Sequence, residues 1–186
     1  MLSINRILWP TDLSRGAQPA FSHAAALAHW HDAQLHVLNV REGEEDVRTD
    51  MAEQFPLSDG TLAGYLDAGE ASGRPFDVPD LSLEQTQVDA PSPAEAIVSY
   101  VEDHDIDLAV LGTHGRRGLQ RLLIGSVAEE VLRRAPCPVM TVRAGESETS
   151  AWNVGNILAP VDFSEGADLA VRHARDLALP YGARIT

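Results

Sequence analysis

The stretch Leu108-Ala-Val-Leu-Gly-Thr-His-Gly115, followed nine residues later by Gly125-Ser126, decides the fold predicted for this chain. Residues 108–111 are a short apolar run, typical of a strand buried in a parallel sheet. Ser126-Val-Ala-Glu129 has the spacing of a capping box, which predicts Ser126 as the N-cap of a helix. A strand, a glycine-rich loop and a helix start therefore follow one another, as in an α/β protein.

The loop between this strand and this helix has the composition of an anion-binding site. Its glycines allow the backbone to approach an anion closely. The N–H groups and the positive dipole end of the following helix favour negative charge. Three arginines in the loop can form charge-assisted hydrogen bonds to phosphate, namely Arg116, Arg117 and Arg121. Glycines also occur in ordinary strand-to-helix turns, so a purely structural turn is the alternative.

The loop fits the pattern G-x2-G-x9-G-[S/T] with Gly112, Gly115, Gly125 and Ser126. In this motif the sequence resembles the universal stress protein family, whose ATP-binding members carry it. Ile7-Leu-Trp-Pro-Thr-Asp12 and Ala135-Pro-Cys-Pro-Val139 are also similar to family segments, and the likeness covers about residues 3–143. It implies an open five-stranded parallel sheet of order 3-2-1-4-5 with helices on both faces, an adenine-nucleotide α-hydrolase-like fold. It also implies a regulatory module of the stress response that binds ATP, with or without Mg²⁺.

A nucleotide would bind where the first and fourth strands end side by side, since open parallel sheets bind ligands beyond the carboxyl ends of their strands. Asp12 is expected to accept hydrogen bonds from a ribose hydroxyl or a base amine, or to cap the first helix together with Ser14, or both. His114 either donates to a phosphate or occupies an exposed turn. The resemblance assigns Val40 and Leu111 to adenine and Val127 to a backbone contact. The candidate nucleotide-binding residues are Pro10, Thr11, Asp12, Val40, Leu111, Gly112, His114, Gly115, Arg116, Arg117, Gly125, Ser126 and Val127.

Composition excludes several classes of function. The 186 residues include 28 acidic and 14 basic ones, and the net charge of −14 opposes binding to nucleic acid or anionic lipid. Every basic residue is arginine, so the lysine of a Walker loop, of a protein kinase or of a Schiff base is missing. The single cysteine, Cys137, is interpreted as a packing residue and fits a reducing compartment. No leader and no apolar span of about 18–20 residues is recognisable, so a cytoplasmic protein is expected.

No catalytic residue and no metal site are predicted. The sequence places no general base near the glycine loop, which favours a binding module over a slow ATPase or a nucleotidyl-transfer enzyme of the same superfamily. An interaction module with an unused pocket is a further alternative. His29, His31 and His36 lie near a helix end and on a strand, and no carboxylate has metal-ligand spacing. They are interpreted as solvated histidines.

Hydrophobic periodicity and cap signals predict the other elements. Strands are expected at 4–9, 35–40, 83–88, 107–111 and 139–142, with 83–88 at an edge, and helices from Ser14 or Gly16 to His31, at 93–104 after the cap Ser92, and at 126–134. In the obscure stretch 41–81, a helix within 51–66 is expected to be interrupted at Pro56 and Gly60. The fifth strand, Val139 to Val142, would offer an open edge, through which members of the family usually dimerise.

The beginning of the chain is repeated after 150 residues. Ile7-Leu-Trp-Pro-Thr-Asp12 corresponds to Ile157-Leu-Ala-Pro-Val-Asp162, and 13 of the 33 pairs from 4/154 to 36/186 are identical without a gap. The predicted organisation is a nucleotide-binding domain at 1–144, a polar linker at 145–153, and an incomplete second repeat at 154–186. A piece of that size cannot build a core alone, so its apolar side chains are expected to find a partner or to stay poorly ordered.

Overall fold

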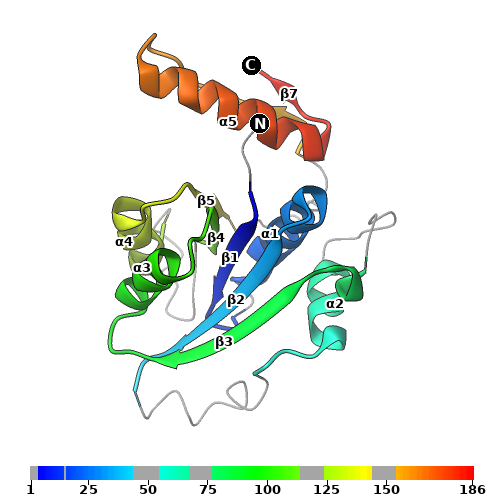
Figure 1. Ribbon diagram of the computed structural model, residues 1–186, viewed down its shortest axis with the longest axis vertical. Coiled ribbons are helices and arrows are strands. Elements are labelled where there is room, and N and C mark those ends of the chain that lie inside the picture. The colour runs from blue at the N-terminus through cyan, green and yellow to red at the C-terminus, as the bar shows by residue number, and fades with distance from the viewer. Residues whose placement is uncertain (1–3, 15, 44–54, 68–76, 114–123, 144–153) are drawn as a thin grey trace.

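The computed structural model describes residues 4–14, 16–43, 55–67, 77–113, 124–143 and 154–186. Five parallel strands form one sheet in the order β3-β2-β1-β4-β5, as predicted (Figure 1). The strands are β1 (Arg6–Thr11), β2 (Gln34–Arg41), β3 (Leu83–Asp89), β4 (Leu108–Gly112) and β5 (Val139–Val142). Because β1 lies between β2 and β4, the chain leaves the sheet in opposite directions after β1 and β4. Open parallel sheets bind ligands at such a position, beyond the carboxyl ends of the strands.

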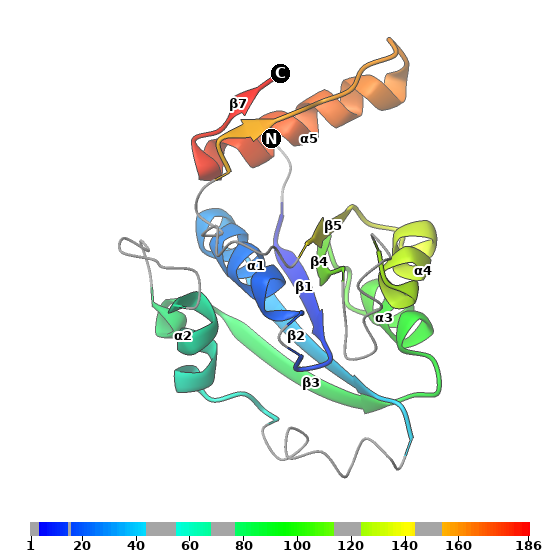
Figure 2. The same cartoon turned by 180° about the vertical axis from the view of Figure 1, so that it is seen from behind.

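Helices cover both faces of the sheet, also as predicted (Figures 1 and 2). One face carries α1 (Gln18–His31) and α2 (Asp59–Asp67), and the other carries α3 (Pro93–Asp103) and α4 (Ser126–Arg134). Ser92 caps α3 as expected, because its side chain accepts a hydrogen bond from the Glu95 N–H. Gly60 lies inside α2, so the expectation that it interrupts a helix is wrong. A short 3-10 helix, Val78–Asp80, precedes β3.

The side chains of β1 point alternately to the two faces of the sheet and contribute to the apolar cluster on each face. Ile7 and Trp9 are buried on the face of α1 and α2, and Leu8 is buried on the face of α3 and α4. The Trp9 ring packs against Phe21 with centroids 4.9 Å apart, and its indole N–H donates to the Ala17 carbonyl at 3.2 Å. Trp9 thereby fixes the entry of α1 against the strand that leads into the candidate site.

The edge strand β3 is joined to the segment before α2 by one side chain. The Gln85 carboxamide accepts a hydrogen bond from the Leu57 N–H at 2.8 Å and donates to the Leu57 carbonyl at 2.9 Å. This pair of bonds resembles a backbone pairing between strands, although one partner is a side chain. It fixes the segment containing Leu57 beside β3.

Residues 154–186 repeat the geometry of the first strand–helix–strand unit. They form β6 (Asn156–Ile157), α5 (Glu165–Tyr181) and β7 (Arg184–Ile185), in which Ile157 pairs with Ile185 as Ile7 pairs with Leu35. The turn after each first strand contains a residue with positive φ, 63° at Leu13 and 65° at Phe163. A positive φ is thus common to the corresponding turns of the two segments.

The repeated unit contacts the main domain through its helix. The Tyr181 hydroxyl lies 2.9 Å from His23 Nδ1 of α1, and the two rings meet edge to face. Both figures show α5 lying across the end of the domain where α1 finishes. None of the helices in the described part of the chain is long and apolar enough to span a membrane.

Candidate functional site

The turn between β1 and α1 is held by its own side chains. The Asp12 carboxylate accepts a hydrogen bond from the Ser14 N–H at 3.0 Å, and the Thr11 hydroxyl accepts one from the Leu13 N–H at 3.0 Å. Asp12 therefore has a structural role in this turn. The prediction that Ser14 caps α1 is wrong: the N-cap is Ala17, and no side chain caps it within the described residues. Asp12 is half-buried at the carboxyl end of β1.

The end of β4 is in close contact with this turn. A Cβ atom at Gly112 would lie 2.6 Å from the Gly16 carbonyl oxygen and 3.0 Å from the Ala17 Cα. Only glycine permits two backbone segments to approach so closely. The structure thus brings Gly112 beside the turn that contains Asp12, as the strand order predicts, and gives this glycine a packing role of its own.

Helix α4 begins differently from the capping-box prediction. Its N-cap is Gly125, and no side chain in the described region caps it, so the assignment of Ser126 as N-cap is wrong. The cause is a tertiary contact: the Gly125 N–H donates to the Thr113 carbonyl at 2.8 Å, which holds Gly125 in an extended conformation. Ser126 is consequently the first helical residue, and its side chain is exposed. The N–H groups of Ser126, Val127 and Ala128 have no acceptor within the helix.

The other predicted residues fall into three groups. His114, Gly115, Arg116, Arg117 and Arg121 lie outside the described residues, so only the two ends of the glycine loop are placed. Pro10 and Thr11 are buried in β1. Leu111 is 3% exposed within the apolar cluster under α3 and α4, and Val40 and Val127 pack partly buried against the same cluster.

Asn39 is a site residue that the sequence interpretation missed. It is buried on β2, where its side chain donates to the Thr11 carbonyl at 2.9 Å and accepts from the Gln87 side chain at 2.8 Å. This chain of bonds joins β3, β2 and β1 at their carboxyl ends, and it holds the carbonyl immediately before Asp12. The available signal was an asparagine within the apolar run Leu35–Val40, because a buried polar side chain needs partners.

Replacing Asn39 with alanine is expected to lower the free energy of unfolding by about 2 kcal/mol, because the Thr11 carbonyl and the Gln87 amide lose their buried partner. A urea titration of Asn39→Ala, Gln87→Ala and the double variant measures the coupling between the two side chains. Since each shares a hydrogen bond with the other, the double variant should cost less than the sum of the single ones. If the free-energy changes of the two single variants add exactly to that of the double variant, the proposed chain of hydrogen bonds from Gln87 through Asn39 to Thr11 is contradicted.

The expectation that His36 is a solvated histidine is wrong. It is 2% exposed, its Nδ1 lies 3.0 Å from the Tyr100 hydroxyl, and burial lowers its pKa although Glu84 opposes the shift. Tyr100 stacks on His104 with ring centroids 3.7 Å apart. His36 is buried because β2 is an internal strand of the sheet. Among the described residues, no three histidine, cysteine or acidic side chains form a group suited to a metal ion.

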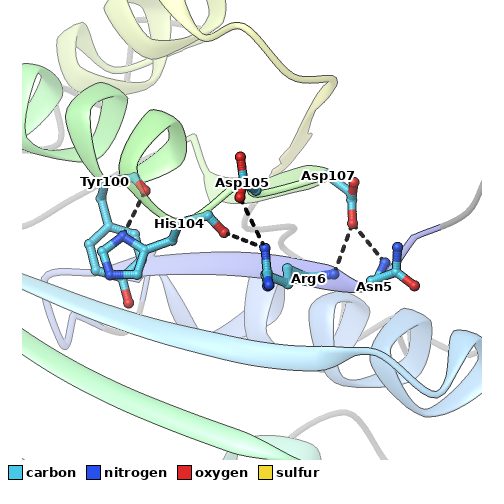
Figure 3. A network of polar contacts seen from close by, with 6 residues as sticks. All are labelled: Asn5, Arg6, Tyr100, His104, Asp105 and Asp107. Atoms are coloured by element: carbon cyan, nitrogen blue, oxygen red, sulfur yellow. Dashed lines mark hydrogen bonds and ion pairs between the residues drawn. The ribbon is translucent and has the colours of Figure 1, made fainter.

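A polar network ties the amino ends of β1 and β4 together (Figure 3). The Asp107 carboxylate accepts hydrogen bonds from the Asn5 and Arg6 N–H groups at 2.7 and 3.0 Å, and Arg6 Nη1 donates to the His104 carbonyl at 3.1 Å. Because the strands are parallel, this network lies at the opposite end of β1 and β4 from Asp12 and Gly112. It fixes the alignment of the two strands whose far ends form the candidate site.

Comparison with known proteins shows the family of this chain. Residues 3–143 match the model of the universal stress protein family. The chain belongs to this family. A universal stress protein relative from Staphylococcus saprophyticus is 32% identical over 155 residues, which cover 78% of this chain and 87% of the relative.

Solved structures share the fold. A universal stress protein solved in complex with cAMP has a TM-score of 0.57 at 19% identity and covers 77% of this chain and all of its own. A universal stress protein from Archaeoglobus fulgidus has a TM-score of 0.65 at 21% identity. The latter match covers 98% of this chain and 65% of that one, so it extends beyond the family domain into the repeated unit.

Proposed function

We propose that this universal stress protein binds ATP, with or without Mg²⁺, and acts as a regulatory module of the stress response. The observation that carries the proposal is the start of α4. Its N–H groups lack a capping side chain among the described residues, and Gly125 is hydrogen-bonded to the strand end that adjoins the β1–α1 turn. A helix start of this kind favours a phosphate group.

ATP fits the chemistry of the residues at the carboxyl ends of β1 and β4 and at the start of α4. The N–H groups of residues 126–128 and the exposed Ser126 hydroxyl would bind the phosphates, together with Gly115, His114, Arg116 and Arg117 of the loop. Asp12 would accept from the ribose or the base. Val40, Leu111 and Val127 would lie against adenine, with Pro10 and Thr11 supporting the contact. The Gly125 N–H is engaged by Thr113 and is not counted among the phosphate donors. The neighbour solved with cAMP supports an adenine nucleotide.

The repeat provides a matched pair of variants for testing this proposal. Asp162 makes the same bond to the Ser164 N–H, 3.0 Å long, that Asp12 makes to the Ser14 N–H. Asp12→Ala and Asp162→Ala therefore remove the same turn interaction, and only Asp12 is proposed to touch nucleotide. We expect Asp12→Ala to weaken ATP binding about tenfold to a hundredfold, the value of a lost charge-assisted hydrogen bond, and Asp162→Ala to leave it unchanged.

Equilibrium dialysis of refolded protein against labelled ATP measures both affinities. Refolding removes any nucleotide that copurifies with the protein. A dissociation constant on the order of micromolar, equivalent to about −8 kcal/mol, is expected for the unaltered chain. No retention at millimolar ATP, or equal effects of the two aspartate variants, would refute the site. Turnover at about 1 per second or faster would instead indicate an enzyme.

The proposal extends to assembly and organisation. We expect a cytoplasmic homodimer formed through the outer edge of β5, since a strand edge is a natural pairing surface. We also propose that residues 1–144 are the nucleotide-binding domain, that 145–153 are a linker, and that 154–186 are an incomplete second repeat. The structural match that continues through 98% of the chain supports this division.

A further inference from the structure

One ring nitrogen of the buried His36 lacks a hydrogen-bond partner. The His36 side chain belongs to β2 and is 2% exposed, and its Nδ1 lies 3.0 Å from the Tyr100 hydroxyl. Its Nε2 is also buried, and it has no hydrogen-bond partner in the described part of the chain. Because a buried polar atom without a partner costs free energy, the position of this nitrogen requires a physical explanation.

The last turn of α3 packs on the His36 ring. The Tyr100 and His104 rings are stacked with centroids 3.7 Å apart, and each meets the His36 ring edge to face at 5.9 Å. Figure 3 shows the stacked pair, with Arg6 reaching the His104 carbonyl. The His104 Nδ1–H donates to the Tyr100 carbonyl at 3.0 Å. We call His36, Tyr100 and His104 the histidine joint, since they hold the end of α3 against β2.

The surroundings of His36 disfavour a positive charge on its ring. The titratable and charged groups that face it in the described residues are Arg6 of β1, Glu84 of β3, and Tyr100 and His104 of α3. Burial lowers the pKa of His36, Glu84 opposes this shift, and His104 and Arg6 add to it. Glu84 Oε2 lies 3.8 Å from Nδ1, but the Glu84 side chain is 44% exposed, so water screens its charge.

A proton added to the neutral His36 ring would make both ring nitrogens donors. Nδ1 can then donate to the Tyr100 hydroxyl, which can donate in turn to the Thr86 hydroxyl 3.4 Å away. Nε2 would become a charged donor with no acceptor, and a buried charge of this kind costs more than a neutral group. Water can accept from Nε2 only if the end of α3 moves away from β2.

We propose that the histidine joint is an acid-sensitive latch, which holds the end of α3 on the sheet at neutral pH and releases it more often in mild acid, when His36 becomes charged. The ordinary pKa of an exposed histidine is 6.5, so the released state binds the proton more readily than the closed one. Release therefore increases by about tenfold for each pH unit below 6.5, until the closed joint is itself protonated. His36 lies in the amino-terminal half of β2, so the latch needs no nucleotide.

Amide hydrogen exchange of the full chain, followed by NMR at pH 7.5 and pH 5, tests this latch. The His104 and Ile106 N–H groups report on the end of α3, because they bond to the Tyr100 and Val101 carbonyls at 3.1 Å. After correction for the intrinsic effect of pH on exchange, their protection should fall about tenfold to thirtyfold at pH 5. It should also lie below the protection of amides in β1, because the release is local.

Four variants identify the group that senses acid. His36→Asn does not titrate, so it should abolish the change in protection, whereas His104→Asn keeps His36 and should retain the change. Glu84→Gln removes a screened carboxylate at the sheet edge. The closed joint then holds a proton less readily, so the release at pH 5 should be at least as large as in the unaltered chain. His29→Asn alters an exposed histidine of α1 and is the control that should change nothing.

Equal protection of the end of α3 and of β1 at pH 5 would overturn the proposal, because α3 would then leave the sheet only when the whole domain unfolds. The same pH dependence in His36→Asn and in the unaltered chain would overturn it too, as would a loss of the dependence in His104→Asn. A smaller release at pH 5 in Glu84→Gln has the same meaning. The Glu84 variant is decisive even if His36→Asn fails to fold.

Discussion

Gly112→Ala is expected to lower the free energy of unfolding by about 2 kcal/mol and to weaken ATP binding. The added Cβ would lie 2.6 Å from the Gly16 carbonyl oxygen and 3.0 Å from the Ala17 Cα. Both atoms belong to backbone, which cannot rotate away as a side chain can. Either β4 or the entry to α1 must move, and the β1–α1 turn would move with it, so the loss of stability and the loss of affinity share one cause.

Gly64→Ala is the matched control for this prediction. Gly64 lies within α2, and a Cβ atom there would meet nothing within 4 Å. Alanine is a better helix former than glycine, so Gly64→Ala should raise the free energy of unfolding by about 0.5–1 kcal/mol. Urea denaturation measures the two changes, which should have opposite signs. A Gly112→Ala protein as stable as the unaltered one would show that the close approach of β4 to the turn is absent.

The contact between α1 and α5 predicts a dependence of stability on pH. Burial lowers the pKa of His23 to about 4 from its ordinary value of 6.5. The unfolded chain therefore binds a proton more readily than the folded one between these values. The contribution of His23 to the free energy of unfolding is therefore complete above pH 6.5. It declines as the pH falls towards 4, by about 3 kcal/mol in total.

His23→Asn should remove this part of the pH dependence, since asparagine does not titrate and can still reach the Tyr181 hydroxyl. Urea titrations at pH 7.5 and pH 5 provide the comparison, because differences between the two proteins cancel the contributions of His31 and His36, whose pKa values burial also lowers. Tyr181→Phe removes the hydrogen bond but leaves His23 buried, so it should keep the pH dependence. Equal acid sensitivity of His23→Asn and the unaltered chain would contradict the prediction.

The regular elements of the domain could be predicted because their signals are local. The apolar run at 139–142 and the pattern at 126–134 coincide with β5 and α4 as observed. The strand order came from the family resemblance, and the observed order places Gly112 against Gly16 and Ala17, in the turn that follows Asp12. The helix caps and side-chain hydrogen bonds were harder to predict from the sequence, because they depend on neighbours that are distant in the chain.

The two copies of the β1–α1 turn show this limit directly. Ser164 caps α5 by accepting from the Ala167 N–H at 3.2 Å, whereas Ser14, at the equivalent position, does not cap α1. The sequences are alike, but in the first unit Trp9 holds the Ala17 carbonyl and Gly112 presses on the same segment. At the equivalent of Trp9 the second unit has Ala159. The contacts of Trp9 and Gly112 therefore override a capping pattern that operates in the second unit, where Ala159 replaces Trp9.

The pair of hydrogen bonds between Gln85 and Leu57 has a consequence for the solubility of this protein. An extended peptide that added to the sheet at β3 would meet the Leu57 segment, which the Gln85 side chain holds beside this strand. Fibrous aggregation by strand addition requires an edge that is unprotected and flat. On the β3 side, one glutamine thus does what edge lysines or prolines do in other proteins, without adding charge.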